Sequence, residues 1–528
     1  MMAKIYSFFG KWMESKYLFY ALLLVNMLVI CLIKFYPTLD GPVHLYNAHV
    51  VQELFKGNIA LSEFYSINSL PIPNWTSHFI MAILGLVFPG WLVEKIFILL
   101  YVAGMALSFR YLIKQLNPEN LSLSILIFPF IYSFLFYMGF NNFTFSFIFL
   151  FITLGYWIKI HACHKFYHYI TLFLLITATY FTNILAFGFL GLSMGCYTLY
   201  FSYKDYRNFG NLSLSFKSGA KKILGLFIIS LPSLIAALIF YSKIEFHSSG
   251  GNLSISELIK WLNDGRALIV YNYVKEEIIT EQFIHILIIL FIISVLENIK
   301  LKKEKGLPIF QKADVLILPL SVALLFYFLT PNDSNAAMMS DRYSLIILMF
   351  GLAWIVARSV GNKLNPIIIG IVLVFHLYLT VDHFKTLKIL NPHAITIHNM
   401  SDQIEDNSVV LSYNFSDHWM ENWYHNYLGI DKPLIILGNF EATVGWFPVV
   451  WNYEEMPNVL LQEKSAFYEF VLSRLKSNQT TQVDYILLYG QLNKINHSDF
   501  GNLRKVLEED FLLQYESEDF YAQLYKRK

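Results

Sequence analysis

The residues best suited to chemistry lie in a short stretch that follows the first apolar run of the chain. Asp40, His44 and Asn47 follow one another at intervals of four and three residues. If this stretch is helical, the three side chains share one face of the helix. A carboxylate beside an imidazole can take a proton from a hydroxyl group, which is the task of a general base. Asp40 also stands where the helix would begin, so a helix-capping role is the alternative.

The sequence also marks the ends of the helix that would hold these side chains. Pro42 suits the first turn of a helix, and Gly57 suits the position just after its last turn. The stretch begins a few residues beyond an apolar run at 17–33. Its polar groups would therefore lie at the boundary between membrane and water, where such groups often mark a functional site.

The composition predicts a membrane protein. Of the 528 residues, 56% are hydrophobic and 15% are charged, whereas about 25% charged residues is usual in a soluble domain. Lys and Arg number 39 and Asp and Glu 38, so the net charge is +1. That balance excludes the basic surface of a nucleic-acid-binding protein. Three cysteines cannot hold together a secreted disulfide scaffold of this length.

Long apolar runs predict about 11 transmembrane helices, since a crossing needs about 20 apolar residues. Lys4, Lys11 and Lys16 precede the first run, which predicts a cytoplasmic N-terminus. The basic residues of alternate connections then all fall inside, and everything after 382 falls outside. We expect an integral protein of a bacterial inner membrane with a periplasmic C-terminal domain. The predicted spans are 17–33, 91–112, 121–139, 143–160, 169–182, 184–203, 222–241, 283–299, 313–330, 343–359 and 364–381.

Two regions differ from these spans. Residues 75–89, in the predicted outer loop 37–90, are apolar but short, and we expect a half-inserted or surface-lying helix there. From 382 to 528 the chain is more polar and has short apolar stretches, which are typical of buried strands. We therefore predict a transmembrane domain over 1–381 and a small extracytoplasmic α/β domain over 382–528. Its expected elements are strands at 408–413, 433–437 and 484–489, a helix at 464–476, and two final strands joined at 516–519.

This order of parts resembles a known family. A first span, an acidic residue just beyond it, a long outer loop, many spans and an outer C-terminal domain are similar to the GT-C superfamily of membrane glycosyltransferases. In particular, the sequence resembles the branch that holds the protein O-mannosyltransferases and the lipid A aminoarabinose transferases. The resemblance implies a polyprenyl-phosphate-linked sugar donor and Asp40 as the catalytic base. Many relatives have a second acidic residue where this chain has Gly139-Phe140-Asn141-Asn142, which leaves metal dependence open.

A donor phosphate also requires outward-facing cations, which stabilise the charge on the leaving group. Arg342 opens the span at 343–359, where a guanidinium can grip a phosphate with two bonds beside a helix N-terminus. Pairing with Asp341 or with lipid headgroups is the alternative, and an Arg-Tyr pair at this place also resembles the family. The other candidates for donor-phosphate binding are Lys95, Lys243 and Arg266.

Two of these cations have local context. Lys95 follows Glu94, with which it would otherwise pair. Arg266 follows a short amphipathic helix at 255–263, where Ser254 and Glu257 have the spacing of a capping box.

Several polar and aromatic residues are candidates for substrate binding. Asn141, Asn142 and Asn183 lie at predicted outer span ends, and Tyr343 follows Arg342. The asparagines would hold sugar hydroxyls or cap helices. Tryptophans of the C-terminal region can stack on sugars, although packing explains them better; they are Trp419, Trp423, Trp446 and Trp451.

No metal ligand and no cofactor is predicted. The group most suggestive of a metal site falls in a basic cytoplasmic turn of the predicted topology. It consists of His161, Cys163, His164 and His168.

The sequence thus predicts a membrane glycosyltransferase, transferring a hexosyl or pentosyl group. The donor is a polyprenyl-phosphate-linked sugar, and the acceptor is an extracytoplasmic glycan, lipid or protein of the cell envelope. Asp40 is the predicted base, and His44 orients it or binds the acceptor. One alternative is a glycan polymerase or ligase, which would depend on Arg342 and Arg266 more than on Asp40. The other is a transporter or flippase, which calls for polar groups and broken helices at the bilayer midplane.

Overall fold

The computed structural model describes residues 13–162, 165–243, 253–305, 310–332, 337–358, 364–452 and 483–528. The chain groups into two compact units. The helical unit consists of Met1–Val29, Leu100–Tyr137 and Asn142–Phe384. The mixed unit consists of Ile30–Leu99, Met138–Asn141 and Lys385–Lys528. Residues 30–99, which the sequence analysis placed in the transmembrane domain, thus group with the C-terminal residues.

Long apolar helices dominate the described part of the chain. Eight of them are long and apolar enough to cross a membrane, and three shorter apolar helices account for the other predicted spans. The protein is therefore an integral membrane protein, while the number of about 11 crossings stays a prediction. The eight are α6 (Gly90–Leu116), α9 (Asn141–Ile160), α11 (Ile184–Phe209), α12 (Leu212–Lys243), α14 (Tyr273–Lys305), η3 (Lys312–Leu316) with α15 (Ile317–Leu329), α16 (Met339–Arg358) and α17 (Asn365–Met400). The shorter ones are α2 (Lys16–Cys31), η1 (Pro118–Ile127) with α7 (Phe128–Ile131), and α10 (Phe166–Thr182).

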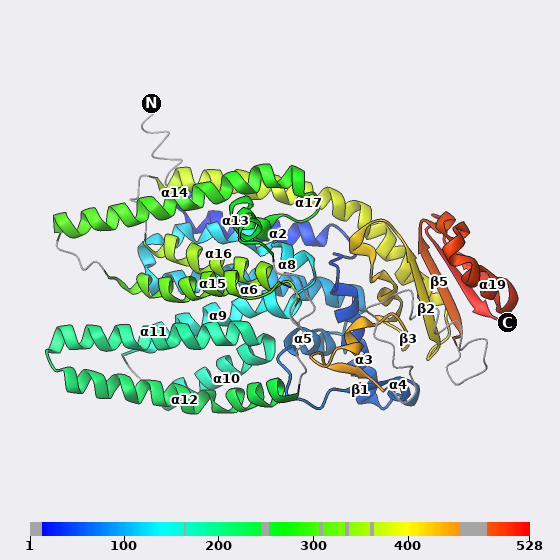
Figure 1. The fold of residues 1–528 in the computed structure, drawn as a ribbon, viewed down its shortest axis with the longest axis horizontal. Helices are drawn as coiled ribbons and strands as arrows, with labels where there is room; N and C mark the ends of the chain where they lie inside the picture. Colours follow the sequence, from blue (N-terminus) through cyan, green and yellow to red (C-terminus); the bar gives the residue numbers. More distant parts are fainter. Residues whose placement is uncertain are drawn as a thin grey trace. The chain divides into compact units, whose positions relative to one another are not determined.

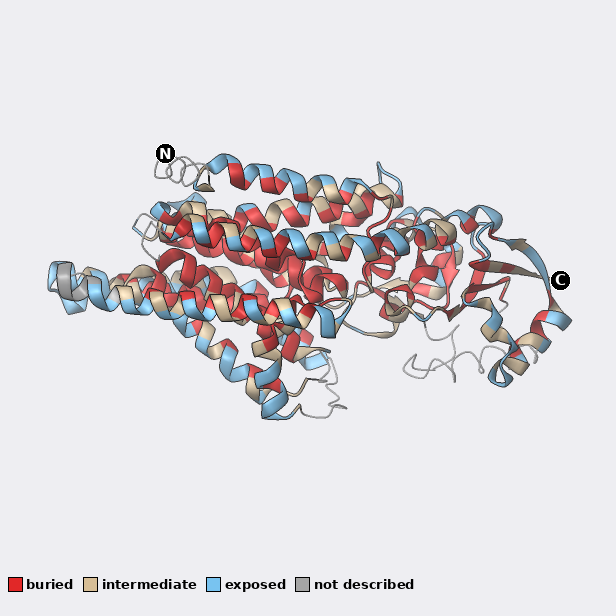
Figure 2. Ribbon diagram, turned by 90° about the horizontal axis from the view of Figure 1, so that it is seen from above, coloured by how far each residue is buried: buried red, intermediate tan, exposed pale blue. Residues whose placement is uncertain are grey.

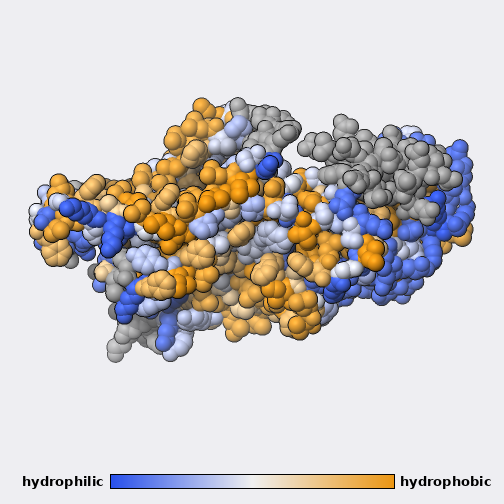
Figure 3. Space-filling model, turned by 90° about the horizontal axis from the view of Figure 1, so that it is seen from below, coloured by the Kyte–Doolittle hydropathy of each residue, from blue (hydrophilic) through white to orange (hydrophobic). Residues whose placement is uncertain are grey.

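The helices of the helical unit pack in pairs and leave apolar faces uncovered. Helix α15 packs on α16, and α12 packs on both α10 and α11. Buried and exposed residues alternate along the helices, so that each helix turns one face to its neighbours (Figure 2). Figure 3 shows a broad hydrophobic surface, as expected where lipid replaces water. The exposed apolar residues of α12 include Leu224, Phe227, Ile228, Leu231, Ile235 and Leu238.

One predicted span is interrupted. The apolar run at 121–139 forms the end of η1, then α7, and after a break at Tyr132 and Ser133 the short helix α8 (Phe134–Tyr137). Tyr132 has φ −96° and ψ 52°, which is not helical. Residues 123–137 are all buried. An irregular backbone is tolerated at membrane depth only where protein covers it, so the burial explains the interruption.

Helix α17 continues well beyond the predicted span at 364–381. It has 36 residues and ends at Met400, so the polar residues that follow 381 do not end the helix. The strands of the C-terminal region therefore begin later, after a 3₁₀ turn at Ser401–Gln403.

A five-stranded sheet forms the C-terminal part of the mixed unit (Figure 1). Its strand order is β3-β2-β5-β7-β6, with β2 parallel to β3 and β5, and β7 antiparallel to β5 and β6. The central strands β2 and β5 are buried along almost their whole length, as parallel strands covered on both faces are. This confirms the predicted strands, while the predicted helix at 464–476 lies outside the described residues. The strands are β2 (Val409–Phe415), β3 (Ile435–Ile436), β5 (Tyr485–Gly490), β6 (Phe511–Glu516) and β7 (Ala522–Arg527).

The residues around 37–90 form short elements of the same unit. They are α3 (Gly41–Lys56), α4 (Ile59–Phe64), β1 (Tyr65–Ile67) and α5 (Thr76–Leu84). Strand β1 pairs antiparallel with β4 (Val449–Trp451), and the rings of Tyr65 and Trp451 stack at 4.3 Å. Helix α5 has nine residues, far fewer than the roughly 20 that a crossing needs. The expectation of a short helix is therefore confirmed, and its half-inserted or surface-lying position stays a prediction.

Candidate functional site

Asp40 lies at the start of α3, as predicted, but it does not cap this helix. It has φ −90° and ψ −4°, and its side chain makes no capping hydrogen bond. Its backbone is held from two sides, because its N–H donates to the Met138 carbonyl at 3.2 Å and its carbonyl accepts from the His44 N–H at 3.1 Å. These backbone bonds fix the position of the half-buried Asp40 in the chain, and the capping interpretation of its side chain is wrong.

Gly139 packs directly on the backbone of Asp40. Its φ is +78°, a conformation that favours glycine. A Cβ at this position would lie 2.6 Å from the Asp40 nitrogen and 2.9 Å from the Asp40 Cα. The Gly139 carbonyl oxygen also accepts a hydrogen bond from His44 Nε2 at 2.8 Å. The segment Gly139-Phe140-Asn141-Asn142 therefore contributes backbone contacts that fix the first turn of α3.

Two histidines and a glutamate meet beside this turn. They come from three segments: His44 from α3, His78 from α5, and Glu441 from the 3₁₀ helix η7 (Phe440–Thr443). His44 Nδ1 lies 2.7 Å from Glu441 Oε1, and His78 Nε2 lies 3.2 Å from Glu441 Oε2. The two ring nitrogens are 3.3 Å apart. All three side chains are buried, and their atoms are close enough together to ligate one metal ion.

The electrostatics of this cluster follow from burial and pairing. Burial alone would lower the pKa of His44, but the carboxylates of Glu441 and Asp40 raise it above its usual value. Burial alone would raise the pKa of Glu441, but the two histidines lower it to about 2. Burial lowers the pKa of His78. The surroundings thus favour the protonated form of His44 beside the ionised Glu441, and the neutral form of His78.

Asn47 confirms the predicted helical face. Its Nδ2 donates to Glu441 Oε2 at 2.8 Å, and its Oδ1 accepts from Asn439 Nδ2 at 2.7 Å. His44 and Asn47 therefore point in the same direction from α3, as their spacing predicted. Phe447 packs against the rings of both His44 and His78 and adds apolar cover to the cluster.

Arg266 is one of the predicted cations of the helical unit. It follows α13 (Ile255–Asp264), whose N-terminus has the predicted capping box of Ser254 and Glu257. The Arg266 side chain is 18% exposed, and its Nε lies 3.7 Å from Asp341 Oδ1. The guanidinium lies over the Phe134 ring, 3.8 Å from its centroid, and donates to the Ile269 carbonyl at 3.0 Å.

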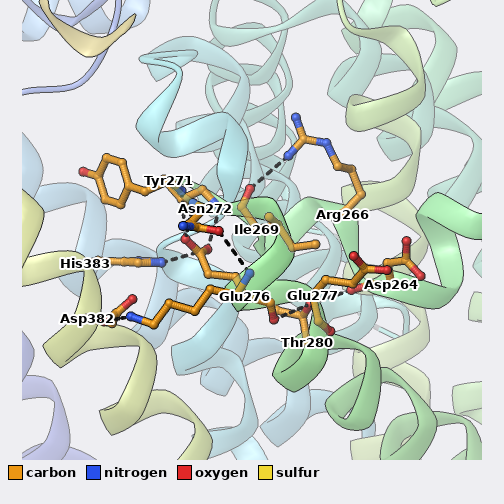
Figure 4. Close-up of polar contacts among 12 residues, drawn as sticks. Asp264, Arg266, Ile269, Tyr271, Asn272, Glu276, Glu277, Thr280, Asp382 and His383 are labelled. Carbon is orange, nitrogen blue, oxygen red and sulfur yellow. Dashed lines mark hydrogen bonds and ion pairs between the residues drawn. The ribbon is translucent and has the colours of Figure 1, made fainter. Parts of the chain in front are cut away.

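Glu276 fixes the loop that carries Arg266. Figure 4 shows the backbone of this loop and His383 converging on the Glu276 carboxylate. The carboxylate accepts hydrogen bonds from the N–H groups of Val270, Tyr271 and Asn272 at 2.7 to 2.9 Å. His383 Nε2 completes the set at 3.2 Å. Such charge-assisted bonds hold a loop rigid, so the position of Arg266 is built into the fold.

Arg342 lies at the start of α16, as predicted. Its Nε donates to the Ala337 carbonyl at 3.1 Å, and its guanidinium lies 5.3 Å from the centroid of the Phe143 ring. Asp341, the alternative partner of Arg342, lies beside Arg266. Tyr343 is buried, and its ring stacks on Phe326 with centroids 5.9 Å apart.

The remaining predicted cations are Lys95 and Lys243. Lys95 lies over the Trp91 ring, 5.2 Å from its centroid. Glu94, its predicted alternative partner, accepts hydrogen bonds at 2.8 Å from the Tyr36 N–H and the Tyr427 hydroxyl. Lys243 is exposed at the end of α12.

The predicted substrate-binding asparagines lie at helix starts, and two of the tryptophans pack on other aromatic rings. Asn183 caps α11, because its Oδ1 accepts from the N–H groups of Leu185 and Ala186. Asn141 and Asn142 are buried in the first turn of α9. Trp423 packs on Phe440 and Trp451 on Tyr65, which favours packing over stacking on a sugar.

Three residues of these sites were not predicted from the sequence: His78, Glu441 and Glu276. His78 stood in a stretch read only for its apolarity, although a histidine in an otherwise apolar segment was a usable signal. Glu441 is 363 residues from His78, and no local pattern connects the two. Glu276 lies in the first turn of α14, next to Glu277, and acidic residues are common at the start of a helix.

Comparison with known proteins shows the fold. No protein-family model matches the sequence, and no curated protein matches it. The crystal structure of ArnT from Cupriavidus metallidurans bound to undecaprenyl phosphate has a TM-score of 0.54 and 10% sequence identity, over 96% of this chain and 97% of that one. ArnT from the same organism in the apo state has a TM-score of 0.40 and 12% identity over the same shares. The first likeness confirms the predicted fold of a polytopic helical protein with a C-terminal sheet-containing domain.

Proposed function

We propose that this chain is a membrane glycosyltransferase that moves a sugar from a polyprenyl-phosphate-linked donor to an acceptor outside the cytoplasm. The supporting observation is the half-buried carboxylate of Asp40, which begins α3 without capping it and lies beside the buried pair of His44 and Glu441. The fold adds support, since ArnT was crystallised with undecaprenyl phosphate. We propose an orientation in which the N-terminus lies in the cytoplasm and the C-terminal domain lies in the periplasm.

Asp40 acts as the general base in this reaction. Its carboxylate takes the proton of the acceptor hydroxyl, and the acceptor oxygen forms a bond to the anomeric carbon of the sugar. The bond from that carbon to the phosphate oxygen breaks, and its electron pair leaves with the polyprenyl phosphate. His44 is a positioning residue, because both of its ring nitrogens are engaged by Gly139 and Glu441.

Arg266 and Arg342 stabilise the charge that develops on the leaving phosphate. Of the cations predicted from the sequence, Arg266 has the most fixed position, because Glu276 holds its loop through three backbone N–H groups. A preorganised cation needs no rearrangement as the charge develops, which is where such groups contribute most to the rate.

The reaction class is tested with donors that carry a label in the sugar. Membranes with and without the chain are incubated with polyprenyl-phosphate-linked hexoses and pentoses. We expect label in an envelope acceptor and release of polyprenyl phosphate only where the chain is present. Transfer only in a parallel incubation with a polyprenyl-diphosphate-linked glycan, with release of polyprenyl diphosphate, would instead indicate a polymerase or ligase. Movement of intact donor across the membrane would indicate a flippase, and either result would replace the proposed function.

Replacing Arg266 with alanine is expected to lower kcat/KM for the donor by roughly 100-fold, the usual effect of losing one group that stabilises developing charge. Arg266→Lys should recover part of the loss, because a lysine keeps the charge but not the planar fork. Donor titrations with purified protein measure both effects. Arg207→Ala, at the exposed end of α11, is the matched control, and an equal loss in it would contradict a specific role for Arg266.

Gly139→Ala is expected to lower sugar transfer by roughly 100-fold, since displacing a reacting group by about 1 Å can cost that much. The added Cβ would overlap backbone atoms of Asp40, which cannot rotate away as a side chain can. Kinetics on monodisperse protein provide the measurement. Gly191→Ala is the control, because a Cβ there meets no atom within 4 Å. Transfer at the control rate would show that this contact does not place Asp40.

A further inference from the structure

The cluster of His44, His78 and Glu441 buries two imidazoles and a carboxylate together, which the packing of an apolar core does not require. Its side chains are at most 4% exposed, and they come from segments at the beginning and near the end of the chain. Burying two imidazoles and a carboxylate is costly unless they are paired or bind a metal ion. Among the described residues, this is the group of His, Cys, Asp and Glu side chains whose ligand atoms lie within 4.8 Å of one another.

The distances match those between ligands of one metal ion. Zinc is bound by histidine nitrogen and carboxylate oxygen at about 2.0–2.2 Å in a tetrahedron, which places neighbouring ligand atoms roughly 3.3 Å apart. The two histidine nitrogens are 3.3 Å apart, and His78 Nε2 is 3.2 Å from Glu441 Oε2. The remaining distance, from His44 Nδ1 to Glu441 Oε1, is 2.7 Å and requires only a small outward shift.

The surrounding hydrogen bonds orient these atoms as ligands. A carbonyl oxygen only accepts, so His44 Nε2 carries the hydrogen that it donates to Gly139. In the neutral ring, the lone pair of His44 Nδ1 therefore points at Glu441 and His78. A second interaction that fixes the tautomer of a ligating histidine is typical of metal sites. Asn47 holds the Glu441 carboxylate in the same manner.

We propose that His44 Nδ1, His78 Nε2 and the Glu441 carboxylate bind one divalent transition-metal ion, with Zn²⁺ as the best match. Two imidazoles and one carboxylate form a donor set that zinc takes in proteins, with a fourth position left for another ligand. The ion would join α3, α5 and η7, and so fix the helix that begins with Asp40. This inference does not rest on the proposed function.

The same three side chains would also be stable with a proton on His44 Nδ1 in place of a bound metal ion. A proton on His44 Nδ1 would make an ion pair with Glu441, and His78 would then be a neutral neighbour. Both arrangements predict that Glu441→Gln lowers stability, so stability alone does not separate them. Metal content does, because only one of them holds an ion.

The experiment uses the full-length chain, purified in detergent with a tag that binds no metal. The protein is incubated with equimolar Zn²⁺, desalted, and analysed by elemental mass spectrometry, and a second sample is loaded with Co²⁺ for its visible spectrum. We expect about one zinc per chain and the intense absorption of four-coordinate cobalt. His78→Gln and Glu441→Gln should both lose the ion. His49→Gln is the matched control, since His49 is on α3 but its Nδ1 lies 2.7 Å from the Gly429 carbonyl instead.

Each result decides the question. Less than about 0.1 zinc per wild-type chain would overturn the site and leave the buried ion pair. A wild-type content of zinc in His78→Gln or Glu441→Gln would place the ion elsewhere and overturn it as well. If the variants do not fold, X-ray absorption on the zinc-loaded wild type decides instead. Two imidazoles and one carboxylate around the ion support the site, and any other ligand set contradicts it.

Discussion

Replacing Asp40 with asparagine is expected to lower kcat for sugar transfer by roughly 100- to 10,000-fold, the range over which a general base accelerates a reaction. Asparagine has almost the same shape as aspartate but cannot take the acceptor proton. The contacts that hold this residue, from its N–H to Met138 and from its carbonyl to His44, belong to the backbone and survive the change. Transfer from a labelled polyprenyl-phosphate sugar, measured at saturating donor, gives the effect directly.

Three comparisons make the Asp40 result specific. Membrane insertion and abundance should stay unchanged in Asp40→Asn. Asp402→Asn, an exposed aspartate of the same unit, should keep the wild-type rate. Asp40→Glu should keep a measurable part of it, because the carboxylate remains but is displaced by one methylene. A wild-type rate in Asp40→Asn would remove Asp40 from the mechanism, whatever the donor proves to be.

Local sequence patterns predicted the elements around the site well. The spacing of Asp40, His44 and Asn47 gave the correct helix and its correct face, because helical periodicity is a local property of the chain. The capping box of Ser254 and Glu257 was equally readable. The buried strands β2 and β5 could be found because a parallel strand covered on both faces is a short continuous apolar run.

Features that depend on distant residues could not be read in this way. The partner of His44 and His78 is Glu441, and only the folded chain brings η7 to α3. The break at Tyr132 was not predicted because the run around it is mostly apolar, although Pro129 and Ser133 stand close to it. Helix α17 extends past its predicted end because helicity does not require apolar residues, although membrane insertion does. Hydropathy predicted where the apolar run of this helix ends, but it did not predict where the helix itself ends.

Gly139 lies in a segment that the family resemblance singled out, but the structure gives this segment a different role. Its segment was notable because many members of the family that the sequence resembles have an acidic residue there. In this chain the segment acts through its backbone: the Gly139 carbonyl accepts from His44, and the missing Cβ leaves room for Asp40. A search for a second carboxylate near Asp40 leads instead to Glu441, which comes from the C-terminal part of the chain and reaches the site through His44.

A second large effect is expected in the stability of the helical unit, at the buried pair of Asp314 and Arg358. Both side chains are 5% exposed. The Asp314 carboxylate accepts from Arg358 Nε at 2.6 Å, from the Trp354 indole N–H at 2.9 Å and from the Gln311 N–H at 2.7 Å. One carboxylate thus joins η3 to the last turn of α16, and its hydrogen bonds offset the cost of removing both charges from water.

Asp314→Ala is expected to lower the free energy of unfolding by about 3–5 kcal/mol, because it leaves the Arg358 guanidinium buried without its carboxylate. Denaturant-induced unfolding of the purified protein measures this loss. The double variant Asp314→Leu with Arg358→Met should lose less than Asp314→Ala alone, since it buries no unpaired charge. Glu509→Ala, which breaks the exposed pair with Lys505, should cost less than about 1 kcal/mol. If Asp314→Ala costs no more than Glu509→Ala, the buried pair does not stabilise the helical unit, and the packing of α15 on α16 must hold η3 in place without it.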